Sequence, residues 1–173
     1  MNLGSICTRP VITMPRSGNL RQAAGLMREH HVGSLVITED TADGPWVAGL
    51  ITDRDLAIDV LARGVDAASV EVGRVLDSRL VSAPEDADLT DAIDLMQAEG
   101  VRRLLVRNED GDLVGLVSFD DLLEVCAAQL SGLAAVARAG IEQEAAKRAA
   151  AAAPARPTVR VPAMGTASWL PGT

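Results

Sequence analysis

The sequence predicts an α/β (α+β) fold of two tandem β-α-β-β-α units packed as a pseudo-two-fold pair, followed by a C-terminal helix. Three observations lead to this prediction. The chain repeats itself once, each copy carries strand-like and helical hydrophobic patterns in the same order, and a helical pattern continues beyond the second copy. Hydrophobic residues make up 48% of the 173 residues but aromatic residues only 2%, so aliphatic side chains must build the core.

The internal repeat is visible as a regular offset between matching residues, which changes once along the chain. With an offset of 69, Met27 aligns with Met96. Further along, the offset becomes 66, and residues 49–56 (GLITDRDL) align with residues 115–122 (GLVSFDDL). The three extra residues fall in the polar stretch Glu39–Trp46, which gives the first copy a longer turn. Two unrelated domains would not keep this register, so the chain contains a duplicated unit.

Each copy contains five predicted elements. Helices are predicted where apolar residues recur at i, i+3, i+4 and i+7, and strands where short apolar runs end at turn residues. In the first copy these are a strand at Val11–Met14, a helix from Leu20, strands at Ser34–Thr38 and Val47–Ile51, and a helix from Asp53. In the second copy they are a strand at Leu80–Ala83, a helix from Leu89, strands at Leu104–Arg107 and Leu113–Val117, and a helix from Phe119.

The predicted elements divide the chain into five segments. We expect the first unit at residues 1–63, a linker at 64–73, the second unit at 74–126, a C-terminal helix at 127–153 and an irregular or disordered tail at 154–173. A unit of about 60 residues buries only about 60% of its unfolded surface, so the two units are expected to pack together. The tail is predicted from its four prolines and few charges.

Composition and charge exclude several classes of function. With 16 Lys and Arg against 24 Asp and Glu, the net charge is −8, whereas a nucleic-acid-binding protein needs a basic surface or aromatic platforms. The two cysteines, Cys7 and Cys126, lack the spacing of a metal site or a disulfide framework, and His30-His31 has no third ligand at a suitable spacing. No nucleophile–base pair, paired-acid site or dinucleotide fingerprint occurs, so we expect no enzymatic activity.

Targeting and membrane segments are not evident in the sequence. The N-terminus lacks the basic and apolar regions of a secretory signal, and we expect no apolar stretch of the roughly 18 residues needed to span a bilayer. We therefore expect a cytoplasmic protein that does not insert into a membrane.

The same short motif closes each copy: apolar-Gly-x-apolar-(Thr/Ser)-x-x-Asp. It places Thr52 three residues before Asp55, and Ser118 three residues before Asp121, where a strand is expected to pass into a helix. With two copies in matching context, the chain resembles a tandem pair of cystathionine-β-synthase-type (CBS) domains, called a Bateman module, over about residues 4–126.

The resemblance implies a regulatory module that senses an adenosyl ligand in the cleft between its two domains, with Thr or Ser on phosphate and Asp on ribose. It allows AMP, ADP, ATP, S-adenosylmethionine or a nicotinamide dinucleotide, and implies no other cofactor. Any regulated enzyme or transporter would be a separate effector protein. The alternative function is a ligand-independent dimerisation or protein-interaction module.

Physical chemistry allows two interpretations of the motif. A hydroxyl residue followed three residues later by an acid can form a capping box at a helix N-terminus. The same helix N-terminus favours an anion such as phosphate, to which the hydroxyl adds a donor. Both copies carry Asp where capping boxes prefer Glu or Gln, which favours the ligand-binding interpretation.

Charge makes the first motif the stronger candidate for a nucleotide. Arg54 stands beside Asp55 and offers a cation to phosphate, whereas Phe119-Asp120 brings a further acid to the second motif. Arg102 and Arg103 open the strand after the second copy's first helix. They either neutralise phosphate in the cleft or form a solvated strand edge, and the sequence favours neither.

The predicted C-terminal helix carries an apolar stripe of Leu130, Leu133, Val136 and Ile141. The repeats offer no third sheet to cover it, and monomers rarely expose a large apolar patch. We therefore expect a two-fold homodimer in which this helix takes part. The alternative is that the helix folds back over its own pair of domains.

Overall fold

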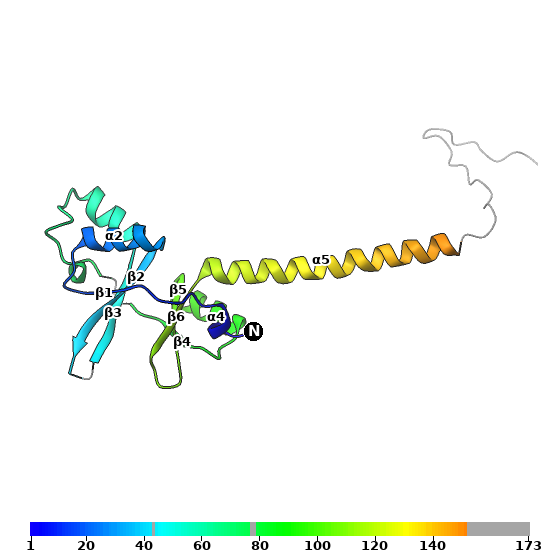
Figure 1. Cartoon of the computed structure of the whole chain (residues 1–173), viewed down its shortest axis with the longest axis horizontal. Helices are drawn as coiled ribbons and strands as arrows, with labels where there is room; N and C mark the ends of the chain where they lie inside the picture. Colours follow the sequence, from blue (N-terminus) through cyan, green and yellow to red (C-terminus); the bar gives the residue numbers. More distant parts are fainter. Residues whose placement is uncertain (43, 77–78, 152–173) are drawn as a thin grey trace, which may run out of the picture. The chain divides into compact units, whose positions relative to one another are not determined.

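The structure is a computed structural model that describes residues 1–42, 44–76 and 79–151. The chain divides into two compact units, Met1–Ala127 and Ala128–Thr173. The first unit contains two three-stranded sheets, each accompanied by helices (Figure 1). This confirms the predicted α/β (α+β) class of two β-α-β-β-α copies followed by a C-terminal helix.

The two halves of the first unit contain the same elements in the same order. The first half consists of α1 (Leu3–Ile6), β1 (Thr13–Pro15), α2 (Leu20–His30), β2 (Ser34–Thr41), β3 (Gly44–Thr52), α3 (Asp53–Leu56) and the π-helix η1 (Ala57–Ala62). The second half consists of the 3₁₀ turn η2 (Val72–Arg74), β4 (Ser82–Pro84), α4 (Leu89–Glu99), β5 (Arg103–Arg107), β6 (Leu113–Ser118) and α5 (Phe119–Ala150).

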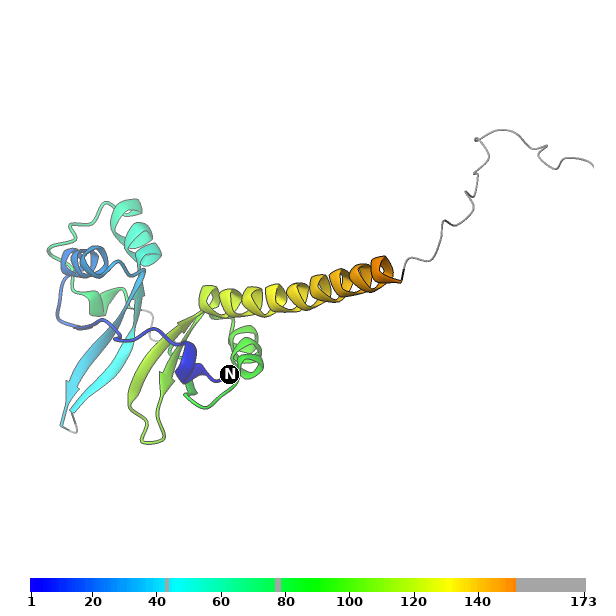
Figure 2. The ribbon, with the colours of Figure 1, turned by 45° about the vertical axis from the view of Figure 1, so that its right-hand side comes forward.

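Both sheets have the same topology. The orders are β1-β2-β3 and β4-β5-β6, with the first pair parallel and the second pair antiparallel. A parallel pair requires a crossover, which α2 and α4 provide, whereas short turns close the hairpins β2–β3 and β5–β6 (Figure 2). The hairpin registers shift at equivalent places, between Ile37 and Thr38 and between Val106 and Arg107.

Local sequence explains where the crossover helices begin and end. Asn19 and Asp88 are the N-caps, and each forms a capping box with the third residue of its helix. The helices end at His31 and Gly100, which have φ angles of 53° and 65°. Glycine adopts this left-handed conformation without penalty, whereas a side chain does not, so the first copy has the less favourable helix end.

Each half has its own hydrophobic core between its sheet and its helices. The first core contains Met14, Leu20, Ala23, Met27, Leu35, Ile37, Ile51 and Val72. The second core contains Leu3, Ala83, Ala92, Met96, Leu104, Val106, Val117 and Leu122. All of these side chains are aliphatic or methionine, in agreement with the scarcity of aromatic residues.

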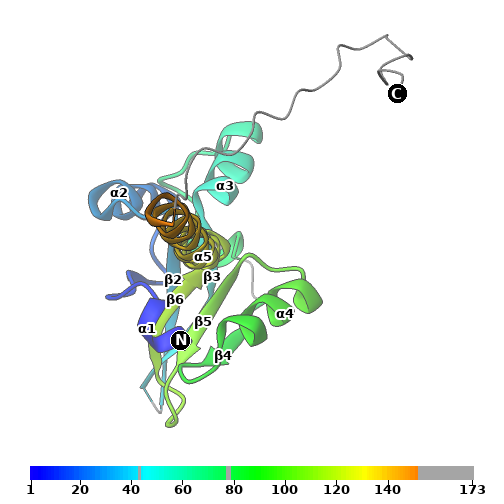
Figure 3. The same cartoon turned by 90° about the vertical axis from the view of Figure 1, so that its right-hand side faces the viewer.

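The first short segment of each repeat packs into the core of the other half. Leu3 of α1 is fully buried in the second core, and Val72 of η2 is fully buried in the first. The Leu3 N–H donates to the Ala87 carbonyl at 2.9 Å, and the Val72 N–H donates to the Gly18 carbonyl at 2.8 Å. Figure 3 shows α1 beside β6. The segment 64–73, interpreted from the sequence as a linker, therefore contributes a core residue.

The second unit begins within α5. Its apolar residues Leu130, Leu133, Val136 and Ile141 are 67–72% exposed. Among the described residues, α5 is also the one helix that is long and apolar enough, by length and composition alone, to cross a membrane. This finding corrects the expectation that no such stretch exists, because alanine and glycine extend the apolar pattern between few charges. The predicted tail at 154–173 lies outside the described residues.

Candidate ligand-binding site

The first motif lies where β3 passes into α3. Oδ2 of Asp55 accepts hydrogen bonds from the Thr52 backbone N–H at 2.8 Å and from the Thr52 hydroxyl at 2.7 Å. The Asp55 N–H donates in return to Thr52 Oγ1 at 3.3 Å. The two residues therefore form a complete capping box.

The second motif repeats this geometry where β6 passes into α5. Oδ2 of Asp121 accepts from the Ser118 N–H and from the Ser118 hydroxyl, both at 2.7 Å, and the Asp121 N–H donates to Ser118 Oγ at 3.2 Å. Among the described residues, Oδ2 is the oxygen that each motif carboxylate uses in these bonds. Oδ1 of each carboxylate therefore remains able to accept a hydrogen bond from a ligand, so the capping geometry does not exclude ligand binding.

A cavity of about 390 Å³ opens at the second motif. Its size falls within the range of small-molecule pockets. Its walls come from the segment before β1, from the end of α2 and the start of β2, and from the second copy of the repeat. The lining residues are Thr8, Pro10, Val11, Ile12, His31, Val32, Gly33, Ser34, Val36, Arg103, Leu116, Ser118, Asp120 and Asp121.

The predicted site residues separate into those that line this cavity and those that do not. Arg103 joins the second motif in the cavity, together with Ser118 and Asp121. Arg102 lies outside it: its Nη2 is 3.9 Å from Oδ1 of Asp120, and its guanidinium carbon is 5.6 Å from the centroid of the Phe119 ring. Because the side chains of Arg102 and Asp120 are 73% and 77% exposed, their attraction is weak.

The first-motif residues do not line this cavity; they are Thr52, Arg54 and Asp55. By the repeat offset of 69, the counterpart of the segment 8–12 is residues 77–81, and residues 77 and 78 lie outside the described residues. The expectation that the first motif is the stronger nucleotide site therefore stays a prediction.

Sequence reasoning missed the residues that the first half contributes to the cavity. Thr8 lies there because it pairs with β6: its N–H donates to the Leu116 carbonyl at 2.9 Å, and the Leu116 N–H donates back at 3.3 Å. His31 lies there because it ends α2 in the left-handed conformation. Neither residue belongs to a recurring motif, so no pattern in the sequence could have identified it.

Arg9 helps to hold the segment before β1. Its Nε donates to Cys7 Sγ at 3.2 Å, and its Nη2 lies 3.3 Å from Oε2 of Glu85. The contact with Cys7, and then the contact with Glu85, raise the pKa of Arg9, so its guanidinium stays charged. Among the described residues, no three or more His, Cys, Asp or Glu side chains are grouped as a metal site would require.

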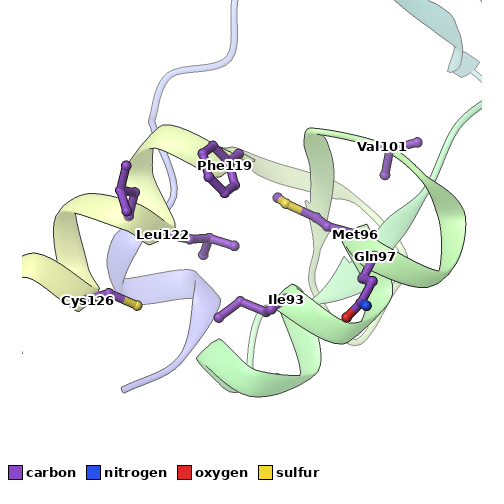
Figure 4. A pocket seen from close by; sticks show the side chains of 8 residues that line it. Ile93, Met96, Gln97, Val101, Phe119, Leu122 and Cys126 are labelled. Atoms are coloured by element: carbon purple, nitrogen blue, oxygen red, sulfur yellow. The ribbon is translucent and has the colours of Figure 1, made fainter.

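A second hollow, of about 300 Å³, lies between α4 and the first turns of α5 (Figure 4). Its lining side chains are almost all apolar: Ile93, Met96, Gln97, Val101, Phe119, Leu122, Leu123 and Cys126. Ile93, Phe119 and Leu123 are 41–55% exposed. Large apolar side chains that are half-exposed in one place are typical of an interaction surface.

The family model of the CBS domain matches the chain twice, at residues 3–61 and 72–128. The chain belongs to the CBS-domain family. One match falls on each half of the first unit, so the chain carries a tandem CBS pair, as its resemblance to that family implied.

Individual relatives agree with this assignment. The chain is 34% identical over 125 residues to Uncharacterized protein MK0525 of Methanopyrus kandleri, which covers 72% of this chain and 62% of that relative. It is 34% identical over 115 residues to CBS domain-containing protein YhcV of Bacillus subtilis, with coverages of 66% and 78%. The chain therefore spans less than two thirds of the Methanopyrus relative.

A solved structure shares the fold. CBS domain protein PAE2072 from Pyrobaculum aerophilum, complexed with AMP, matches with a TM-score of 0.61. The sequence identity is 22%, and the match covers 73% of this chain and 99% of PAE2072. At this identity the likeness supports the CBS-pair fold.

Proposed function

We propose that this CBS pair is a regulatory module that senses an adenosyl ligand in the cavity formed by residues of both CBS domains. One observation carries the proposal: the second motif opens into a cavity of about 390 Å³ that residues of the first CBS domain also line. A ligand in this cavity would contact both domains at once. Its binding would therefore favour one arrangement of the domains over others, as a sensor requires.

The cavity offers a partner to each part of an adenosyl ligand. Oδ1 of Asp121 is available to the ribose hydroxyls, and the aliphatic side chains of Val11, Ile12 and Leu116 offer an apolar wall to the purine. The Ser118 hydroxyl can rotate from Asp121 towards the 5′ substituent, which would lie at the N-terminus of α5. The AMP complex of the fold neighbour PAE2072 is consistent with this ligand class.

A second, equivalent site is proposed at the first motif. Thr52 and Asp55 have the same capping geometry as their counterparts, and Arg54 adds a cation. The repeat offset relates Gly33, which lines the cavity, to Arg102, so Arg102 would face a ligand at the first motif. The Thr52 hydroxyl and the two arginines would bind phosphate, and Asp55 would bind ribose, so these four residues suit a ligand that carries phosphate.

Ligand binding is tested by thermal shift and calorimetry with AMP, ADP, ATP, S-adenosylmethionine and NAD. A ligand at 100 times its Kd should stabilise the folded chain by about 2.7 kcal/mol for each site that it occupies. The double variant Asp55→Ala/Asp121→Ala should lose this stabilisation, whereas Asp112→Ala, in the β5–β6 turn, should keep it. No response from the wild-type chain to any of these compounds would reject the sensor proposal in favour of an interaction module.

We also propose that the chain forms a homodimer through apolar helical surface. The half-exposed residues of the hollow between α4 and α5, and the exposed residues Leu130, Leu133, Val136 and Ile141, all lose contact with water if a second copy covers them. Most such contacts are two-fold symmetric. Light scattering should give a dimer for the full chain and a weaker dimer for a chain that ends at Gln129. A monomeric full chain at micromolar concentration would contradict the dimer.

In this proposal the chain works as a sensor inside the cell and acts on another protein. The chain acts in the cytoplasm, has no catalytic activity of its own, binds no nucleic acid, and transmits ligand binding to a separate effector protein. In this proposal helix α5 does not insert into a membrane; its first turns pack against the second CBS domain, where Leu122 is 2% exposed. Fractionation of cells that express the full chain tests this location.

A further inference from the structure

We propose that the cavity at the second motif selects an adenosyl compound whose 5′ substituent carries no net negative charge, such as a thioether or a sulfonium, over an adenine nucleotide. The inference rests on the proposed function, because it assumes that an adenosyl ligand occupies this cavity. It follows from the charges around the N-terminus of α5.

The 5′ substituent of the ligand would lie beside Asp120. Ser118 precedes α5, and Asp120 is the second residue of the helix and lines the cavity with Asp121. Among the described residues, the Asp120 N–H has no hydrogen-bond partner, and a free N–H at a helix N-terminus favours an anion. The side chain of Asp120, in contrast, adds a negative charge next to the position that a phosphate would take.

The arginines do not cancel this negative charge. Among the described residues, Arg103 is the one arginine that lines the cavity. A Cβ on Gly33 would lie 3.9 Å from Nη2 of Arg103 and 3.4 Å from Oδ2 of Asp53. Arg102 lies 3.9 Å from Asp120 but does not line the cavity, so it offsets only part of the Asp120 charge. The cavity lining therefore holds Arg103 against Asp120 and Asp121.

The first motif provides the contrast. Arg54 occupies the position that corresponds to Asp120, so the two motifs differ by two unit charges at this point. At a separation of about 6 Å in water, a carboxylate and a doubly charged phosphate repel each other by an amount equivalent to about tenfold in Kd. A neutral thioether does not experience this repulsion, and a sulfonium is attracted.

The test is calorimetry on the full chain carrying Asp55→Ala, which disables the first motif. The probes are AMP, 5′-methylthioadenosine and S-adenosylmethionine. We expect the two sulfur compounds to bind up to about tenfold more tightly than AMP. Adding Asp120→Arg, which copies the first motif, should reverse this preference, and Asp120→Asn should reduce it. Because Asp120 is exposed, unchanged unfolding midpoints without ligand are the control for folding.

The possible outcomes separate the inference from the proposed function. Equal or tighter binding of AMP, with no change of preference in Asp120→Arg, overturns the charge inference while leaving an adenosyl site in place. Binding of none of the three compounds overturns both. Binding that survives Asp121→Ala unchanged places the ligand elsewhere and also overturns the inference.

Discussion

The two CBS domains of this chain have equivalent cores and equivalent capping boxes, but they differ where the second helix of each domain begins and ends. In the first domain Asp53-Arg54 follows the motif hydroxyl, α3 passes into a π-helix, and the helical region ends at Ala62. In the second domain Phe119-Asp120 follows, and α5 continues to Ala150. Residues that build the core therefore stayed equivalent in the two copies, whereas exposed residues at the motif and on the helix face diverged.

This comparison indicates a division of roles between the domains. The helix face of the second domain is apolar, with Phe119 and Leu123 at positions where the first domain has Asp53 and Ala57. The motifs differ in charge: the first domain has the basic residue Arg54 where the second has the acidic residue Asp120. Divergence at these exposed positions is expected to alter binding more than folding, since exposed substitutions usually change stability little.

The largest expected effect on stability concerns α1 and η2, the two segments that pack into the core of the other half. Leu3→Ala should lower the free energy of unfolding by about 2–5 kcal/mol, because it removes a fully buried side chain from the core of the second domain. Val72→Ala should cost less, about 1–3 kcal/mol, because fewer buried carbons are lost. Urea denaturation measures both values. A cost below about 1 kcal/mol for Leu3→Ala would show that α1 is not an integral part of the second core.

The next effect concerns the apolar helix face. Leu123→Arg should weaken the proposed homodimer by about 2 kcal/mol or more, because it introduces a charge beside the hollow of the second domain. The matched control is Ala57→Arg, at the equivalent exposed position of the first domain, which should leave the dimer unchanged. Sedimentation or light scattering over a concentration series measures the dissociation constants. If both variants weakened the homodimer equally, the apolar helix face of the second domain would not be the specific dimer contact.

A smaller effect should distinguish the two motifs. Asp55→Ala should reduce AMP affinity by about 1.5–3 kcal/mol, the range for a hydrogen bond to a charged group. Asp121→Ala should change AMP affinity less, because Asp120 already disfavours phosphate at the second motif. Calorimetry with AMP makes the comparison. Two equal sites, or a site that is lost only with Asp121, would reverse the assignment.

The smallest expected effect concerns the ends of α2 and α4. His31→Gly should raise the free energy of unfolding by up to about 1 kcal/mol, because glycine adopts the left-handed conformation without a side-chain penalty. Gly100→His should lower it by a similar amount. Thermal denaturation without ligand is the measurement. If His31→Gly instead destabilises the chain, the imidazole makes contacts in the cavity that outweigh its backbone strain.

Much of the fold could be predicted because its signals are local. The helices from Leu20 and Leu89 begin where predicted, since Asn19 and Asp88 cap them and the apolar period continues for three turns. The predicted strands were short by one to three residues at several ends. For example, β2 continues to Thr41 because it keeps pairing with β3 through polar residues that no hydrophobic pattern marks.

The candidate site could be predicted only in part. The motif residues were found because the duplication repeats them, and their capping geometry follows from the helix that starts beside them. The contributions of Thr8 and His31 could not be found, because they reach the cavity through a β-bridge and a left-handed helix end. Arg102 and Arg103 are adjacent in the sequence, yet Arg103 lines the cavity and Arg102 does not, because β5 begins at Arg103 and Arg102 precedes it, next to the Phe119 ring.

The sequence by itself determined the duplication, the order of elements and the aliphatic composition of the cores, because periodicity and capping act between residues that are close along the chain. The tertiary structure decided which core each repeat's first segment enters. Leu3 and Val72 occupy the same position in the repeat, and each is buried in the other half, a pairing between residues far apart in the chain that no local pattern encodes. It also decided that the second motif opens into a cavity lined by the first domain, because only packing of the two halves brings Ser118 and Asp121 near Gly33 and His31.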